Sequence, residues 1–157
     1  MDIVLTSNSP GEISSFVKPM VAAIKKTMPD SRIILVITPC QYSSGREIEV
    51  ARSFEEIYEI IFPQEFKHWI LRKDPPKGIT FSKNGAVLFL GGDLMHAVIL
   101  SKKLGYPAFA YSMNRFGWKN SFVKFFVPDE KLAKKAEKSV PCGKIEVVGE
   151  LMIDSVD

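Results

Sequence analysis

Short apolar runs alternate with segments of helical periodicity along the whole chain. The runs at 3–6, 32–38 and 86–90 lack the polar–apolar alternation of a half-exposed strand, and such runs are typical of strands covered on both faces in a parallel sheet. Strands separated by helices predict an α/β fold. We therefore expect a Rossmann-like three-layer sandwich with a mainly parallel sheet, with further strands at 57–61, 107–112, 123–127 and 145–148 and helices at 46–53, 63–72, 94–104 and 130–139.

The helix after the first strand carries the clearest signal. Apolar residues at 13, 16, 17, 20, 21 and 24 follow the spacing of one helical face. Ser9 can cap this helix, Pro10 suits its first position, and Glu12 can complete a capping box. We expect one continuous helix that ends at Pro29.

Composition excludes several classes of protein. The chain has 157 residues, 46% of them apolar, which is enough for one ordered domain spanning 1–157. Two cysteines exclude a disulfide scaffold, and a net charge of +3 is too small to indicate nucleic-acid binding. The N-terminus lacks the basic region of a signal peptide, and no apolar stretch reaches the ~20 residues of a membrane span. We therefore expect a soluble cytoplasmic protein.

Candidate chemistry lies in the loops after the strands, because open α/β sheets bind ligands beyond the carboxyl ends of their strands. The first such loop holds Ser9, Gly11 and Glu12 at a helix N-terminus, which favours an anion or a polar sugar group. It contains neither the dinucleotide fingerprint G-x-G-x-x-G nor a P-loop. The alternative for Glu12 is a purely structural capping role.

The second loop follows the apolar run at 86–90 and contains Gly92 and Asp93. Glycines let a ligand approach the backbone, and Asp93 can act as a general base for a hydroxyl nucleophile. The alternative is that Asp93 only caps the next helix. His96, one turn further on, is expected to be structural or solvent-facing. The two histidines and two cysteines are too widely spaced to indicate a metal site.

The third loop, SMNRFGWKN at 112–120, combines aromatic and basic residues. Phe116 and Trp118 can stack on a sugar or a nucleobase, while Arg115 and Lys119 can pair with phosphate. The alternative is that Trp118 simply anchors the loop on the core.

A fourth feature concerns membranes. Phe62, Phe66, Trp69 and Ile70 share one helical face, with basic residues close by, as in helices that lie on anionic lipid. This interpretation adds a peripheral contact with the inner face of a membrane. The alternative is that the stripe belongs to the core, as most amphipathic stripes do.

Several segments of the chain, taken in their order along the sequence, resemble motifs of lipid-A-disaccharide synthase and its relatives. These are glycosyltransferases with two Rossmann-like domains (the GT-B architecture). SPGEISS at 9–15 resembles the family's A-G-E-x-S-G-D loop, and GDLM at 92–95 its P-D-F-N loop. YSMNRFGW at 111–118 resembles Y-x-S-P-x-x-W-A-W, VPDEK at 127–131 its P-F-E helix, and VPC at 140–142 with VGELMID at 148–154 its V-P-C…V-G-H-P-x-x-D ending. Ser14, Ser15 and Glu150 replace a glycine, an aspartate and a histidine, so the chain is expected to be a divergent relative.

This resemblance implies an inverting transfer of a sugar from a nucleotide-sugar donor to a hydroxyl of a lipid-linked or saccharide acceptor. The chain would be the N-terminal, acceptor-side half, inactive without the C-terminal domain that holds the donor, and it would need no cofactor or metal. Asp93 matches the acidic position of the second motif and would be the catalytic base. The residues expected to bind substrate are Ser9, Gly11, Glu12, Gly92, Asn114, Arg115, Trp118, Lys119 and Glu150.

Two other interpretations stay open at this point. A non-catalytic α/β module that binds a nucleotide, a sugar phosphate or a protein partner would carry the same glycine-containing loops. Half of a sugar-nucleotide epimerase would share the architecture, although those enzymes usually keep the histidine that Glu150 replaces.

Overall fold

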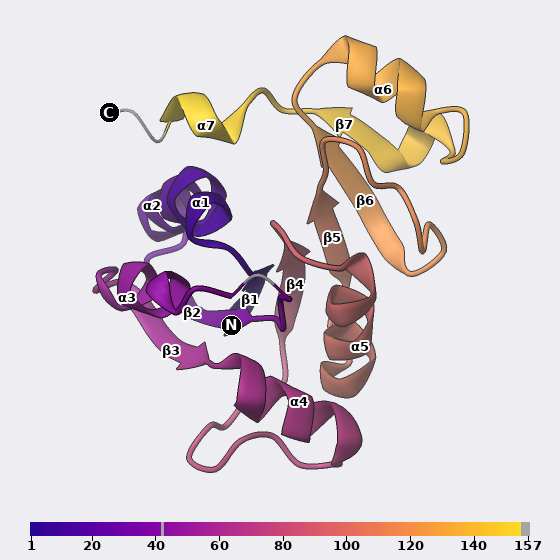
Figure 1. The fold of residues 1–157 in the computed structure, drawn as a ribbon. Coiled ribbons are helices and arrows are strands. Elements are labelled where there is room, and N and C mark those ends of the chain that lie inside the picture. The colour runs from indigo at the N-terminus through magenta and orange to yellow at the C-terminus, as the bar shows by residue number, and fades with distance from the viewer. Residues whose placement is uncertain (42, 155–157) are drawn as a thin grey trace.

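Seven strands form one parallel sheet in the computed structural model, which describes residues 1–41 and 43–154. The strand order is β3-β2-β1-β4-β5-β6-β7, so the direction of strand addition reverses between β1 and β4 (Figure 1). All seven strands occur at their expected places. Their bounds are β1 Asp2–Ser7, β2 Arg32–Ile37, β3 Ile57–Ile61, β4 Gly85–Phe89, β5 Ala108–Tyr111, β6 Phe122–Val127 and β7 Ile145–Val147.

Helices follow every strand except β5, which a loop joins to β6, and they cover both faces of the sheet (Figure 1). The expected helices at 46–53, 63–72, 94–104 and 130–139 are all present, most of them slightly shorter than expected. A short helix after β7, α7, was not expected. The bounds are α1 Pro10–Glu12, a π-helical turn η1 Ile13–Val17, α2 Lys18–Thr27, α3 Arg46–Arg52, α4 Pro63–Leu71, α5 Leu94–Leu104, α6 Glu130–Ala136, a 3₁₀ turn η2 Cys142–Lys144 and α7 Leu151–Asp154.

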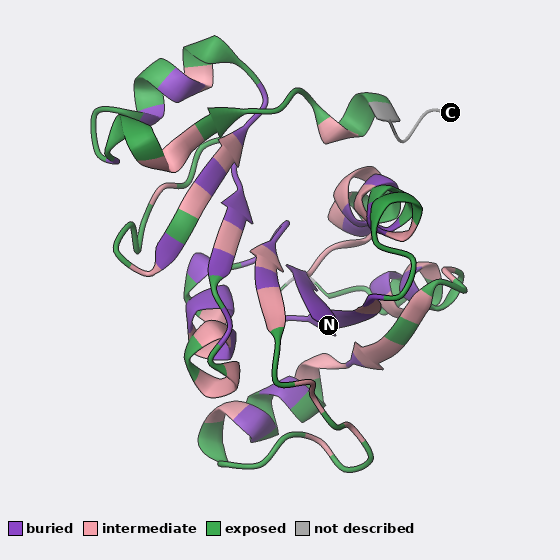
Figure 2. Ribbon diagram, turned by 180° about the vertical axis from the view of Figure 1, so that it is seen from behind, coloured by how far each residue is buried: buried purple, intermediate pink, exposed green. Residues whose placement is uncertain are grey.

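The central strands are buried because each face of the sheet packs against its own layer of helices. Every residue of β1 is buried (Figure 2). Successive residues contribute to opposite faces of the sheet. Val4 belongs to the core that includes residues of α4 and α5, whereas Ile3 and Leu5 belong to the core that includes residues of η1, α2 and α3. The continuous apolar runs of the sequence thus reflect a sheet covered on both sides.

The first helix is not the continuous α-helix that the periodicity predicts. A π-helical turn, Ile13–Val17, interrupts it, and the Lys18 backbone N–H bonds to the Ile13 carbonyl. Pro19 follows directly. Proline has no N–H to bond to the carbonyl four residues earlier, and its ring crowds that carbonyl, so a wider turn just before it relieves the conflict.

The apolar stripe of α4 lies in the core, and the prediction that it contacts a membrane is wrong. Phe66 is 0% exposed and Trp69 is 3% exposed, and both pack in the core beneath α4 and α5. Phe62 and Ile70 are partly buried against the two cores. None of the helices in the described ranges is long and apolar enough to cross a bilayer.

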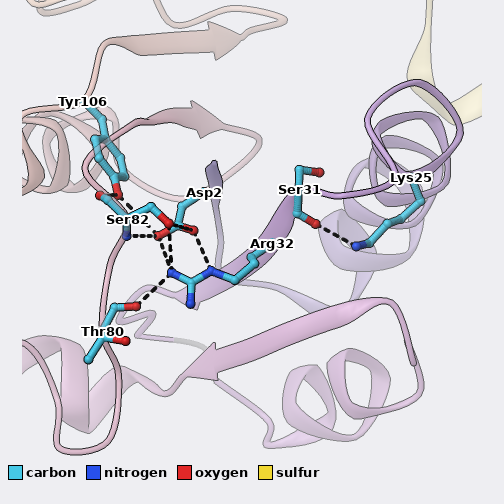
Figure 3. A network of polar contacts seen from close by, with 7 residues as sticks. All are labelled: Asp2, Lys25, Ser31, Arg32, Thr80, Ser82 and Tyr106. Atoms are coloured by element: carbon cyan, nitrogen blue, oxygen red, sulfur yellow. Dashed lines mark hydrogen bonds and ion pairs between the residues drawn. The ribbon is translucent and has the colours of Figure 1, made fainter.

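An ion pair between the buried Asp2 and the partly exposed Arg32 ties the amino end of the sheet together (Figure 3). The carboxylate of Asp2 accepts hydrogen bonds from Arg32 Nε at 2.8 Å, Arg32 Nη2 at 2.9 Å and the Ser82 backbone N–H at 2.7 Å. The Tyr106 hydroxyl donates to the same carboxylate at 3.3 Å and to the Ser82 carbonyl. Segments from β1, β2 and the connections before β4 and β5 therefore meet at one side chain.

Candidate functional site

The candidate site lies at the opposite end of the sheet, where β1 and β4 end side by side. These strands flank the point at which the strand order reverses, and a ligand crevice forms there in open α/β sheets. Four loops start at this edge, with described residues at 8–9 after β1, 38–41 and 43–45 after β2, 90–93 after β4 and 112–121 after β5.

Two hollows open between these loops, and they share three residues. The first has a volume of about 280 Å³ and the second about 270 Å³. Glu12, Gly92 and Arg115 line both, so the hollows adjoin one another. The first is also lined by Phe16, Phe89, Leu90, Gly91, Tyr111, Ser112, Met113 and Asn114, and the second by Asn8, Pro39, Cys40, Gln41, Asp93 and His96.

Glu12 reaches into the site instead of closing the capping box that the sequence predicts. Ser9 does cap the helix, since its Oγ atom accepts from the Glu12 backbone N–H at 3.2 Å. The Glu12 carboxylate, however, accepts from Ser7 Oγ and from the Asn8 backbone N–H, each at 3.4 Å. The capping interpretation is therefore half right: the backbone of Glu12 is part of the cap, while its side chain lines both hollows.

Gly91 makes room for this carboxylate. A Cβ atom added at Gly91 would overlap the carboxylate of Glu12. We expect Gly91→Ala to displace the Glu12 carboxylate at a cost of less than about 1 kcal/mol in the free energy of unfolding, because only the far end of a flexible side chain has to move. A crystal structure of the variant shows the displacement. Gly117→Ala is the matched control, because its nearest atom, in Leu94, would lie at 3.9 Å. A Glu12 carboxylate in the same position in both variants would contradict the packing described here.

Asp93 caps α5, as its alternative interpretation predicts. Its Oδ1 atom accepts from the Met95 backbone N–H at 2.8 Å, and the residue is exposed. This bond uses one of its two carboxylate oxygens, and Asp93 also lines the second hollow. Capping and a role in the site are thus compatible. Gly92 has a φ of +87°, and a side chain there would meet Thr38 Oγ1 at 2.6 Å, so the turn favours glycine.

Arg115 connects the third loop to the second. Its Nη1 atom donates to the Gly92 carbonyl at 2.8 Å, which holds the guanidinium at the boundary of the two hollows. The Ser112 hydroxyl fixes the loop locally, because it accepts from the Arg115 backbone N–H at 2.9 Å. Asn114 lines the first hollow beside it. A carboxylate and a guanidinium thus face the same space from different loops.

Five of the predicted substrate-binding residues lie outside the two hollows. Trp118 is 51% exposed and has a φ of +56°, so its side chain does not anchor the loop on the core. The half-buried Phe116 anchors the loop instead, since its ring packs edge-on against Phe125 at 5.8 Å between ring centroids. Lys119 donates to the Ser139 carbonyl at 3.1 Å. The remaining three line neither hollow, namely Ser9, Gly11 and Glu150.

The structure adds residues that the sequence pattern did not single out as binding residues. Phe16 and Tyr111 form an aromatic wall of the first hollow, with ring centroids 5.6 Å apart. His96 lines the second hollow and packs edge-on against Phe66. Burial lowers the pKa of His96, although the nearby Asp93 charge raises it, and its Nδ1 atom is buried without a hydrogen-bond partner. For Phe16 and Tyr111, the sequence pattern predicts only that each is a core residue. That the two rings lie side by side follows from the fold.

Among the residues that the structure describes, no group of three or more His, Cys, Asp or Glu side chains is arranged to hold a metal ion. The charged groups at the site are the carboxylates of Glu12 and Asp93 and the guanidinium of Arg115. Carboxylates accept hydrogen bonds from sugar hydroxyls and can take a proton from one of them, and a guanidinium pairs with anionic oxygens.

The sequence matches no family model and no curated protein. Among solved structures, the UDP-GlcNAc 2-epimerase from Methanocaldococcus jannaschii is similar over 99% of this chain, with a TM-score of 0.54 and 15% sequence identity. This chain spans 47% of that protein, about half its length. At this identity the likeness shows the fold alone. It confirms the predicted α/β fold, and the chain has a Rossmann-like architecture with a parallel sheet.

Proposed function

We propose that this chain is the acceptor-side domain of a GT-B glycosyltransferase, related to lipid-A-disaccharide synthase, that transfers a sugar from a nucleotide donor to a hydroxyl of a lipid-linked or saccharide acceptor. One observation carries the proposal. Two adjoining hollows at the strand-order reversal share the Glu12 carboxylate, and a second carboxylate, Asp93, lines one of them. The GT-B-like fold of the structural neighbour supports it.

The sizes of the hollows favour a sugar over a complete nucleotide sugar. Each holds less than 300 Å³, which is the lower limit of the roughly 300–1,000 Å³ typical of pockets for drug-sized ligands. One sugar ring suits such a space. The aromatic wall of Phe16 and Tyr111 offers an apolar surface for the face of a ring, and Glu12 offers acceptor oxygens for its hydroxyls.

In the proposed reaction, Asp93 acts as the general base. Its carboxylate takes the proton of the acceptor hydroxyl as the hydroxyl oxygen bonds to the anomeric carbon of the donor sugar, and the bond from that carbon to the nucleoside diphosphate breaks. The diphosphate leaves with the electron pair. Asp93 lies at the mouth of the second hollow and has an oxygen that the cap of α5 does not use, as this step requires.

A second candidate is one half of a sugar-nucleotide epimerase. The specific observation in its favour is the structural neighbour, which is itself a UDP-GlcNAc 2-epimerase. The two candidates differ in their products. An assay of the protein as the cell makes it, with UDP-GlcNAc in the absence and presence of an acceptor, separates them, since an epimerase converts the donor without acceptor and a transferase releases UDP only with it.

The proposal predicts that Glu12→Gln weakens sugar binding. A hydrogen bond to a charged group contributes about 1.5–3 kcal/mol, so we expect at least a tenfold higher dissociation constant for N-acetylglucosamine, measured by NMR titration of the 157-residue chain. The matched control is Glu55→Gln, at an exposed position after α3. UDP is the second ligand, and we expect it to bind this chain more weakly than the sugar. Unchanged sugar affinity in Glu12→Gln, or UDP as the preferred ligand, would refute the proposal.

A further inference from the structure

Tyr111 joins the first hollow to the segment that follows the sheet. The residue is 3% exposed at the end of β5, and its ring lines the hollow. Its hydroxyl donates to the Gly149 carbonyl at 3.4 Å and accepts from the Leu151 backbone N–H at 3.3 Å. A single hydroxyl can do both. One side chain therefore contacts the hollow with its ring and holds α7 with its oxygen.

The backbone around α7 is shaped for this contact. Gly149 has a φ of +89°, which allows a turn that side chains disfavour, and the chain then passes over η1 and α2 (Figure 1). The Leu151 side chain is partly buried against the same core as Tyr111. Met152 and Ile153, in contrast, are exposed. The Leu151 side chain and the Tyr111 hydroxyl thus both help to hold the short helix in place.

Phe16 is a second aromatic residue that contacts both the Tyr111 ring and the first hollow. It belongs to the π-helical turn, lines the first hollow, and packs on Tyr111 at 5.6 Å between ring centroids. η1 also contacts α7. A ligand that contacts this aromatic wall therefore contacts Tyr111, which holds α7 directly, and a residue of the helical turn that packs beside α7. Burial raises the pKa of Tyr111, while the Leu151 N–H lowers it and the charges of Glu150 and Asp129 raise it, so the hydroxyl stays protonated at neutral pH.

We propose that Tyr111 is a positioning residue that couples occupancy of the first hollow to the docking of α7. A sugar ring on the Phe16–Tyr111 wall fixes the Tyr111 ring and, through it, the hydroxyl that holds Gly149 and Leu151. By thermodynamic reciprocity, docked α7 prepares the wall for the sugar to the same extent. The identity of the ligand rests on the proposed function, whereas the connection between wall and α7 does not.

The first arm of the test needs no ligand. Tyr111→Phe keeps the ring and removes the hydroxyl. Because one hydrogen bond contributes about 1 kcal/mol, the Leu151 amide should exchange with solvent about fivefold faster in this variant, measured by NMR hydrogen exchange. Tyr58→Phe is the matched control, because Tyr58 is 56% exposed on β3, at the far edge of the sheet. Unchanged exchange at Leu151 would overturn the proposal.

A double-mutant comparison tests the coupling itself. Leu151→Ala removes the apolar side chain that packs α7 on the core. In the chain that keeps Tyr111, we expect this substitution to shift the NMR amide resonance of Ser112, which lines the first hollow. In the Tyr111→Phe background, we expect no such shift. Equal shifts in both backgrounds, or none in either, would mean that the hydroxyl carries no coupling and would refute the proposal.

The second arm adds N-acetylglucosamine. We expect Leu151 exchange to slow as the sugar saturates the wild-type chain, and to stay constant in Tyr111→Phe even though the sugar still shifts the resonances of Gly92 and Ser112. Sugar binding without slower exchange in the wild type would overturn the coupling and leave the proposed function intact. An absence of sugar binding would count against the proposed function, and the ligand-free arm would then decide the coupling alone.

Discussion

Asp2→Ala is expected to lower the free energy of unfolding by about 2–3 kcal/mol, because it leaves hydrogen-bond donors around a fully buried position without their acceptor and removes the partner of a partly exposed guanidinium. Asp2 is 0% exposed, and its carboxylate accepts from Arg32, Ser82 and Tyr106. Its loss leaves the Ser82 N–H and the Tyr106 hydroxyl without this acceptor and removes the ion-pair partner of Arg32, whose side chain is 29% exposed (Figure 3). Chemical denaturation of the purified chain measures the effect.

The same network predicts how stability depends on pH. Burial pulls the pKa of Asp2 upward, but hydrogen bonds from Arg32 and Ser82 and the Arg32 charge outweigh it and hold the pKa below the usual value. A carboxyl group with a lowered pKa contributes stability above its unfolded pKa of about 3.9, and this contribution is lost as the pH falls through the lower folded pKa. Wild type should therefore lose stability below pH 4 more steeply than Asp2→Ala.

Tyr106 belongs to the same network. Burial, followed by the charge and hydrogen bond of Asp2, raises the pKa of the Tyr106 hydroxyl to about 12.

The control variant for Asp2→Ala is Asp30→Ala, at an exposed position after α2. This substitution should lower the free energy of unfolding by less than about 0.5 kcal/mol. If Asp2→Ala costs no more than Asp30→Ala, the buried network does not hold the amino end of the sheet as described.

Asp93→Asn is expected to reduce sugar transfer by at least about 100-fold, the lower end of what general base catalysis contributes. The assay uses the protein as the cell makes it. Asparagine caps helices as well as aspartate does, so the bond to the Met95 N–H and the stability should be retained. The substitution therefore removes proton acceptance and leaves the capping role in place.

Asp93→Ala separates the two roles of this residue. It removes both the base and the cap, so it should lower activity as much as Asp93→Asn and also cost about 1 kcal/mol of stability. Normal turnover by Asp93→Asn would remove Asp93 from the mechanism. Loss of activity only in the alanine variant, together with lower stability, would assign Asp93 to capping alone.

The sequence pattern predicts the position of every strand along the chain because the sheet is parallel and covered on both faces. Under those conditions strands appear as apolar runs, and helices as amphipathic segments between them. The same pattern fails at Pro19, where the apolar spacing continues through a π-helical turn that hydrophobic periodicity does not record. It also misses α7, a single turn held by Tyr111 and Leu151.

The candidate site follows from the sequence only in part. The rule that ligands bind beyond strand ends brings Glu12, Gly92 and Arg115 to one place, since the three follow strands that end at the same edge. Within the loop after β5, however, spacing cannot tell which aromatic ring turns inward. Phe116 packs in the core and Trp118 is exposed, because the backbone turns at Trp118 with a positive φ.

The aromatic wall could not be predicted either, because Phe16 and Tyr111 belong to elements far apart in sequence. Both satisfy the pattern of core residues, and burial is indeed what the structure shows for most of their surface. Both rings also line the first hollow, and this depends on how the folded elements come together, which no periodicity encodes.

A crystal structure of the chain soaked with N-acetylglucosamine tests the central claim most directly. We predict density for one sugar ring in the first hollow, against Phe16 and Tyr111, with a hydroxyl oxygen about 2.5–3.0 Å from the Glu12 carboxylate. A sugar ring found only outside the hollows that share Glu12, Gly92 and Arg115, or an empty first hollow at saturating sugar, would contradict the assignment of this edge of the sheet as an acceptor site.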